Sequence, residues 1–276
     1  MSATETRKRL HRLSHQANIC FAQGHYTLAE LFYLKALALA EEEFSPDHIE
    51  TATVLNNLAI IYKYTARFDQ ARELYLRSLS ITEKTLGPDH TEIASILHNL
   101  GGVEHAAGNF ARANPFARRC VEIRQKALGP DHPDLAADIA ALAAILDGQK
   151  KHEEAEQLYL RALEIFEKAY GPEHYDIAIN LSNLAASYHA QGRDKEAELL
   201  YLRALVMKER LLGADHPDVA VTANNLAVLF KSEQKYEQAE QLYRYALDIF
   251  EKALGPDHPK VVACRENYAK LLAIMD

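Results

Sequence analysis

The pentapeptide "LGPDH" occupies residues 86–90 and occurs again at 128–132. The chain holds four further copies or near-copies: "FSPDH" at 44–48, "YGPEH" at 170–174, "LGADH" at 212–216 and "LGPDH" at 254–258. The histidines that end the six copies are separated by 42 residues throughout, at positions 48, 90, 132, 174, 216 and 258. A fixed period of this length indicates a repeat protein, in which each repeat is one supersecondary unit.

Each repeat carries the apolar spacing of two α-helices. In "TATVLNNLAIIYKY" (51–64) the apolar residues follow i, i+3, i+4, i+7 spacing, and the same pattern returns in "QARELYLRSLSITEKTLG" (70–87) after a short polar turn. No segment alternates as a strand would. The sequence therefore predicts an all-α fold with a first and a second helix in every repeat.

Aligned repeats show columns of small residues beside one column of large residues. Small side chains let two helices approach closely, and large ones fill the space between helix pairs. The alternation predicts interlocking helix pairs. One small column reads Ala29, Ala71, Ala113, Ala155, Ala197, Ala239; another reads Ala36, Ser78, Cys120, Ala162, Ala204, Ala246; the large column reads Tyr33, Tyr75, Ala117, Tyr159, Tyr201, Tyr243.

The order Leu55-x2-Leu58-Ala59-x2-Tyr62, followed by Ala71-x3-Tyr75, resembles the tetratricopeptide repeat pattern. The 42-residue length, the "NNLA" of the first helix and the "LGPDHP" between repeats resemble the kinesin light chain type of this repeat. The resemblance implies a right-handed superhelical solenoid of six helix pairs plus a C-terminal capping helix. We expect one solenoid domain over 1–276, with repeats at about 7–47, 48–89, 90–131, 132–173, 174–215 and 216–257 and the capping helix at 258–275.

Both ends of the chain differ from the inner repeats. The last helix carries Lys260, Arg265, Glu266 and Lys270 among its apolar residues, and Gln16 stands where later repeats have leucine. Polar end helices close the core of a solenoid to water. With the initiator methionine, they lead us to expect a complete solenoid.

The recurring loop has two interpretations. In "LGADHPDVA" (212–220), Gly213 suits a left-handed helix end, Pro217 suits a first helical turn, and Asp215 and Asp218 suit the capping of the next helix. The histidines would then pack or hydrogen-bond at the junction between repeats. The alternative, metal or acid–base chemistry at each Asp-His pair, is disfavoured because successive loops would lie about 10 Å apart. Histidines from different loops could not then reach one ion.

Composition and motifs narrow the function. The chain has 276 residues, 48% of them hydrophobic, and a formal net charge of −8, which disfavours nucleic acid as a partner. The three cysteines form no CxxC pair, and Cys20 and Cys120 fall in core columns. There is no secretory signal, no apolar stretch long enough for a membrane, and no nucleotide-binding, zinc-protease or nucleophile-elbow motif. We expect a cytoplasmic, non-enzymatic protein without a cofactor or metal, with no nucleic acid or membrane partner, and a monomer.

The resemblance places a peptide-binding groove on the first helix of each repeat. Two adjacent columns carry asparagines, and a third carries bases. For the column that begins at Asn57, binding a peptide backbone and bonding between helices remain alternatives, whereas Asn56 and Asn224 are expected to bind a ligand. The predicted groove residues are Asn56, Asn57, Lys63, His98, Asn99, His105, Ala140, Ala144, Asn183, His189, Asn224, Asn225 and Lys231.

One repeat replaces the polar groove residues by Ala137, Ala140, Ala141 and Ala144. These alanines predict a shallow apolar patch between basic columns, or they simply favour helix formation. With the patch, the groove would take an acidic segment with a bulky apolar anchor. The function that follows is an adaptor or scaffold that binds a segment of a partner protein. The alternatives are a regulatory repeat module that controls a protease or NTPase in a signalling or defence system, and a self-associating solenoid.

Overall fold

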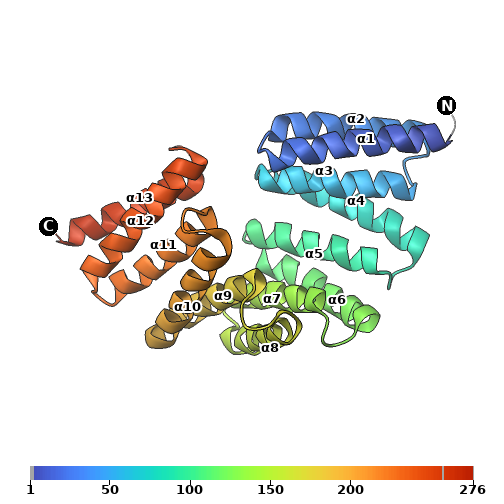
Figure 1. Cartoon of the computed structure of the whole chain (residues 1–276). Helices are drawn as coiled ribbons and strands as arrows, with labels where there is room; N and C mark the ends of the chain where they lie inside the picture. The colour runs from blue at the N-terminus through green and yellow to red at the C-terminus, as the bar shows by residue number, and fades with distance from the viewer. Residues whose placement is uncertain (1–2, 257, 276) are drawn as a thin grey trace. The chain divides into compact units, whose positions relative to one another are not determined.

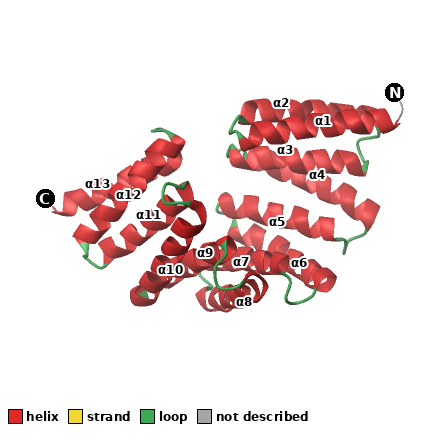
Figure 2. Ribbon diagram, in the orientation of Figure 1, coloured by secondary structure: helices red, strands yellow, loops and turns green. Residues whose placement is uncertain are grey.

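The computed structural model describes residues 3–256 and 258–275, and every regular element in these residues is an α-helix (Figure 1; Figure 2). The all-α prediction, with six helix pairs and one last helix, is confirmed. Asp257 of the last "LGPDH" copy lies outside the described residues. The helices are α1 (Ala3–Ala22), α2 (Tyr26–Glu43), α3 (Ile49–Tyr64), α4 (Phe68–Leu86), α5 (Thr91–Ala106), α6 (Phe110–Leu128), α7 (Pro133–Gly148), α8 (His152–Tyr170), α9 (Tyr175–Ala190), α10 (Asp194–Leu212), α11 (Pro217–Ser232), α12 (Tyr236–Leu254) and α13 (Pro259–Met275).

The chain divides into two compact units, residues 1–130 and 131–276. In both units the odd-numbered helix, called the A helix here, packs against the even-numbered B helix that follows it, as α3 packs against α4 (Figure 1). Within a unit, each B helix also packs against the next A helix. That the units form one continuous solenoid stays a prediction.

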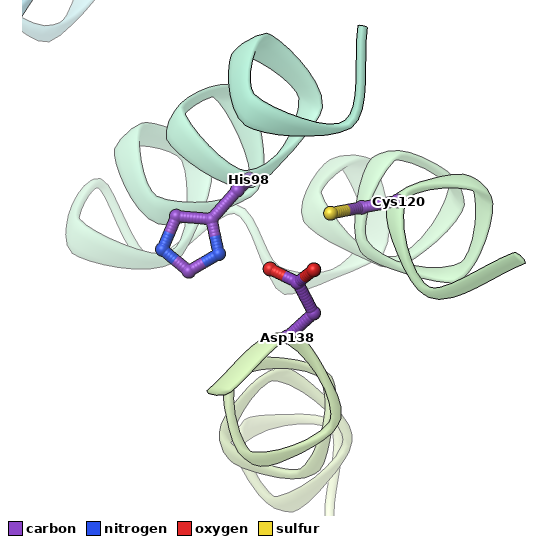
Figure 3. A group of neighbouring side chains, drawn as sticks. All are labelled: His98, Cys120 and Asp138. Atoms are coloured by element: carbon purple, nitrogen blue, oxygen red, sulfur yellow. The ribbon is translucent and has the colours of Figure 1, made fainter. Parts of the chain in front are cut away.

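The small and large columns of the sequence form the core. The six alanines from Ala29 to Ala239 are 0% exposed, and the five tyrosines of the large column are at most 2% exposed. The other small column, which runs from Ala36 to Ala246, also forms hydrogen bonds between helices. The Ser78 hydroxyl donates to the carbonyl of Ala52 at 2.8 Å, and one repeat later the Cys120 thiol donates to the carbonyl of Ala94 at 3.1 Å. Cys120, on α6 in Figure 3, is thus a core thiol, as predicted.

The recurring loop ends one helix and begins the next. Gly213 closes α10 with φ at +87°, and Pro217 lies in the first turn of α11. The carboxylates of Asp215 and Asp218 are not the capping acceptors that the sequence suggested. Instead, the histidine is the N-cap: Nδ1 of His216 accepts from the backbone N–H of Asp218 at 3.1 Å. The same bond recurs at 3.1–3.3 Å at His48, His90, His132, His174 and His258.

The histidine caps give a first prediction. Replacing His216 by alanine should lower the free energy of unfolding of residues 131–276 by about 1 kcal/mol, because one N–H at the start of α11 loses its acceptor. His216→Asn keeps an acceptor at the cap and should restore most of the loss. Urea denaturation of the two variants measures the difference. Equal losses in both would show that the imidazole acts by packing.

Candidate peptide-binding surface

In the first unit, the predicted asparagines bond to one another between neighbouring A helices. The side-chain amide of Asn99 on α5 donates to Oδ1 of Asn56 on α3 at 3.1 Å. Asn56 in turn donates to Oδ1 of its neighbour Asn57 at 3.3 Å. All three side chains are half-buried. The columns of Asn56 and Asn57 are therefore joined by hydrogen bonds between adjacent repeats. The side-chain amides of Asn56 and Asn99 each donate one hydrogen bond to an acceptor within the protein.

The second unit repeats this arrangement on α11 and α13. Asn224 donates to Oδ1 of Asn225 at 3.4 Å and accepts from Asn267 at 3.5 Å. The hydrogen bond between adjacent A helices forms in the two repeats whose residue in the column of Asn56 is an asparagine, Asn56 and Asn224. At Ser182, which occupies that column on α9, the hydroxyl instead donates to the carbonyl of Ala178 in its own helix, at 2.9 Å.

Asn183 on α9 differs from the other asparagines of the ladder. Its counterpart Asn99 finds an acceptor in Asn56, but two repeats after Asn56 the residue is Ala140, which has no polar side chain. Among the residues that the structure describes, the half-buried amide of Asn183 has no hydrogen-bond partner. Its donor and its acceptor are both available to a ligand.

The alanines predicted to form an apolar patch lie on α7. Ala140, Ala141 and Ala144 are half-buried, and Ala137 is exposed. The A helix α9, which carries Asn183, packs against α7 within the same unit. The structure thus places an uncharged face of short side chains on the helix next to that of the unbonded amide.

The basic residues of the third column have different environments. Lys63 on α3 is half-buried, and burial lowers the pKa of its ammonium group; within the described residues it forms no ion pair. A Cβ atom added to Gly102 would lie 2.8 Å from Lys63 Nζ, so this glycine leaves room for the lysine head. The pKa of His105 is lowered first by desolvation and second by the Lys63 ammonium group.

In the second unit, His189 and Lys231 are not equivalent. Nδ1 of His189 lies 2.7 Å from a carboxylate oxygen of Asp194, so a partner inside the protein already holds its ring. Lys231 on α11 is half-buried and makes no ion pair with a described residue. Lys63 and Lys231 are therefore the two groove cations that remain available for an acidic ligand.

A pocket that the sequence did not single out lies in the first unit. It encloses about 320 Å³ and is lined by α3, α4 and α5. Of its lining residues, only Asn56 belongs to the predicted set. The sequence does contain a signal for this pocket, because the repeat keeps the acid but loses the base. Glu92 stands one repeat after Glu50, whereas Ile49 stands one repeat after Arg7.

Potential metal-ligating side chains in the first unit include His98 on α5 and Cys120 on α6 (Figure 3). A protein zinc site uses three or four protein ligands. The Cys120 thiol is also bonded to the Ala94 carbonyl. These two side chains alone do not define a metal site in residues 3–130.

Helix pairs that recur every 42 residues, with polar side chains along the A helices, define a helical repeat protein whose surface is suited to binding other proteins. A tetratricopeptide repeat model matches residues 10–84, 64–126, 92–168, 135–210, 200–252 and 218–276. The chain belongs to the tetratricopeptide repeat family. Repeats of this family indicate a protein–protein interaction scaffold and are typically not enzymes.

Solved structures share this fold. A putative kinesin light chain repeat protein of Podosopora anserina is 24% identical, with a TM-score of 0.60 over 75% of this chain and 96% of that one. BtubC (BKLC) from P. vanneervenii is 21% identical, with a TM-score of 0.62 over 92% and 94%. A STAND signal-transduction ATPase of Pyrococcus horikoshii, which carries a tetratricopeptide repeat sensor, is 18% identical, with a TM-score of 0.69 over 99% of this chain and 40% of that one.

None of the curated proteins matches the sequence. Among the described helices, none combines the length and the apolar character that crossing a membrane requires.

Proposed function

We propose that the A-helix surfaces of this protein bind a segment of a partner protein, as an adaptor or scaffold. The observation that carries the proposal is the unbonded amide of Asn183, on the helix next to the alanine face of α7. Partial burial removes some of the hydrogen bonds that an amide would form with water. A ligand that supplies a donor and an acceptor to the amide replaces those bonds.

The chemistry of this surface favours an extended segment with a bulky apolar side chain. An asparagine offers both a donor and an acceptor, so it can pair with one peptide unit of any sequence. The short side chains of Ala140 and Ala144 leave room above α7 for a larger one. Burying an aromatic or long aliphatic side chain there would supply apolar contact area.

The groove cations favour an acidic residue in the same segment. Lys63 keeps a half-buried ammonium group without an anion, and Lys231 does so in the second unit. A carboxylate brought to either one forms a charge-assisted hydrogen bond in a partly dry site, where such bonds are stronger than in water. We infer a partner segment that combines acidic residues with an apolar anchor.

The test uses the intact chain as bait for a displayed library of random 16-residue peptides, followed by fluorescence anisotropy on the selected peptides. Asn183→Ala should weaken binding about tenfold, the size expected when a ligand bond to a buried polar group is lost. Ala140→Asn should weaken it similarly, because the new asparagine gives Asn183 the internal partner that Asn56 gives Asn99. Ala140→Arg should block the alanine face.

The control is Leu160→Ala, which changes an exposed residue on the B helix α8. This variant should bind as the wild type does. Unchanged affinity in Asn183→Ala and Ala140→Asn would contradict the proposal. Capture from a lysate with the same variants then identifies the class of partner, and a protease or NTPase lost from the Asn183→Ala bait would favour the regulatory alternative.

A further inference from the structure

The pocket of the first unit lies between the A helices α3 and α5, above the B helix α4. Its volume is about 320 Å³. Thr53 and Asn56 come from α3, Glu92 and Ser95 from α5, and the buried Ser78 and Thr82 from α4. Three apolar residues, Ile49, Ala52 and Ile96, complete the lining.

The hydroxyl groups of this pocket donate their hydrogens inside the protein. A hydroxyl has one hydrogen to donate and two lone pairs with which to accept. All four hydroxyls donate to backbone carbonyls, and lone pairs on their oxygens remain. The bonds run from Thr53 to Ile49 at 3.1 Å, from Ser78 to Ala52 at 2.8 Å, from Thr82 to Ser78 at 2.8 Å and from Ser95 to Thr91 at 3.5 Å.

The two remaining polar residues add no positive charge. Asn56 donates one amide hydrogen to Asn57 and accepts from Asn99, and its second amide hydrogen is neutral. The carboxylate of Glu92 forms no ion pair with a described residue. The pocket therefore presents one negative charge and several neutral acceptors, which suits a ligand group rich in N–H donors.

The neighbouring repeat shows which group satisfies this glutamate. One repeat earlier, Nε of Arg7 on α1 donates to Oε1 of Glu50 on α3 at 3.2 Å. The counterparts on α3 and α5 are Ile49 and Glu92. Isoleucine has no donor, so Glu92 lacks the guanidinium that Glu50 has, and the pocket lies at that place.

In the second unit, too, the acid at the equivalent position accepts a hydrogen bond from a side chain of the protein. At α9 and α11 the corresponding pair is Tyr175 and Asp218, and the tyrosine hydroxyl donates to the carboxylate. There a side chain of the protein donates to the acid, whereas none of the described side chains donates to the Glu92 carboxylate.

We propose that the pocket around Glu92 binds a lysine or arginine side chain of the partner segment. The inference rests on the proposed function, which it extends to the A helices of the first unit. The ammonium or guanidinium head bonds to Glu92 and to hydroxyl oxygens, and the methylene stem lies along Ile49 and Ile96.

The subsite also sets a direction for the bound segment. Lys63 lies ten residues after Thr53 on the same helix, which is about 15 Å at 1.5 Å per residue. It favours an acidic residue, whereas the Glu92 pocket favours a basic one. A segment that satisfies both needs a basic and an acidic residue separated by about four or five extended positions.

The test begins with peptides selected by the wild-type chain from the random library. Selected peptides should share a lysine or arginine at one position. Replacing that residue by norleucine, which keeps the stem, should weaken binding to the wild type about tenfold and change binding to Glu92→Gln less than about twofold. Ile49→Arg should also weaken the basic peptide, because it supplies the internal cation that Arg7 supplies to Glu50.

The matched control is Glu50→Gln, which removes the same charge where Arg7 already neutralises it. This variant should bind the selected peptides as the wild type does. Selected peptides that show no shared basic position, or that bind Glu92→Gln as tightly as the wild type, would overturn the inference and leave the proposed function standing. Failure to select any peptide would overturn both.

Discussion

Replacing Arg72 by alanine is expected to lower the free energy of unfolding of residues 1–130 by about 3–5 kcal/mol, the cost of leaving one partner of a buried ion pair alone. Glu104 on α5 is 1% exposed, and Arg72 on α4 bonds to both of its carboxylate oxygens. Asn109 donates a third bond, at 3.0 Å. Without the guanidinium, the carboxylate must stay buried with one neutral donor or take up a proton.

This ion pair is a reversed form of one that recurs elsewhere. In three other places a glutamate on a B helix bonds a base that begins the next B helix, and the base lies over an aromatic ring of the A helix between them. Arg72 stands in the glutamate column, Glu104 stands in the ring column and Asn109 stands in the base column, so here a base replaces the glutamate and an acid replaces the ring. The recurring sets are Glu30, Arg67 and Tyr62; Glu156, Arg193 and Tyr188; and Glu198, Lys235 and Phe230.

Urea denaturation combined with hydrogen exchange of α4 and α5 measures the loss, because hydrogen exchange reports the stability of individual helices. The matched control is Arg77→Ala, which breaks the exposed pair with Glu41 and should cost at most about 1 kcal/mol. The double variant Arg72→Met with Glu104→Leu should recover most of the stability, because no charge is then buried alone. A loss below 1 kcal/mol in Arg72→Ala would refute the argument.

Replacing Lys208 by methionine is expected to raise the stability of the second unit at pH 7 by about 1–3 kcal/mol, the usual cost of burying a polar group that is incompletely compensated. Lys208 on α10 is 4% exposed, and its ammonium group donates to the Thr222 hydroxyl at 2.8 Å. The same column holds Phe166 and Phe250, both 2% exposed. Methionine fits this apolar site, and the Thr222 hydroxyl keeps its bond to the Asp218 carbonyl at 3.2 Å.

The gain should depend on pH. Burial lowers the pKa of Lys208 below 10.5, with the Asp218 carboxylate opposing the shift and Lys260 adding to it. Below the folded-state pKa, both states carry the proton and the burial cost is fully present. As pH rises from that value towards 10.5, the folded state releases its proton while the unfolded state keeps it, so the wild type becomes more stable. The advantage of Lys208→Met should therefore shrink over this alkaline range.

Denaturation curves at pH 7 and at pH 10 measure both effects. The exposed Lys195 lies on the same helix, and Lys195→Met should change stability by less than about 0.5 kcal/mol at either pH. A loss of stability in Lys208→Met at pH 7 would show that the bond to Thr222 and the attraction of Asp218 outweigh the cost of burial.

Features that depend on neighbours along the chain could be predicted from the sequence. The 42-residue period fixes the repeat, and the glycine at 213 ends its helix because a left-handed residue suits that place whatever surrounds it. The alanine column that includes Ala71 required only that two helices of one pair come close. The helix end at Gly213 and the close approach of two paired helices each depend only on residues of a single repeat.

The identity of the capping residue could not be predicted from the sequence. The sequence indicated a cap in the loop and assigned it to aspartates, because carboxylates are the commoner N-cap acceptors. The choice of His216 depends on the loop backbone, which brings Nδ1 rather than a carboxylate to the N–H of Asp218. The residue types of the motif predicted that the loop caps a helix. The geometry of the loop backbone decided that His216 is the capping residue.

The sequence by itself determined the family and the order of the helix pairs, and it predicted the residues of the A-helix surface. Only the tertiary structure decided which of them are available to a ligand. Asn99 and Asn183 occupy the same column, yet Asn99 is bonded to Asn56, whereas the residue equivalent to Asn56 two repeats later is Ala140. Likewise, Glu50 and Glu92 are equivalent in the repeat, but Arg7 neutralises only the first. The reason is physical: periodicity fixes each residue's place on its own helix, whereas hydrogen-bond satisfaction depends on the side chain that the adjacent repeat places opposite.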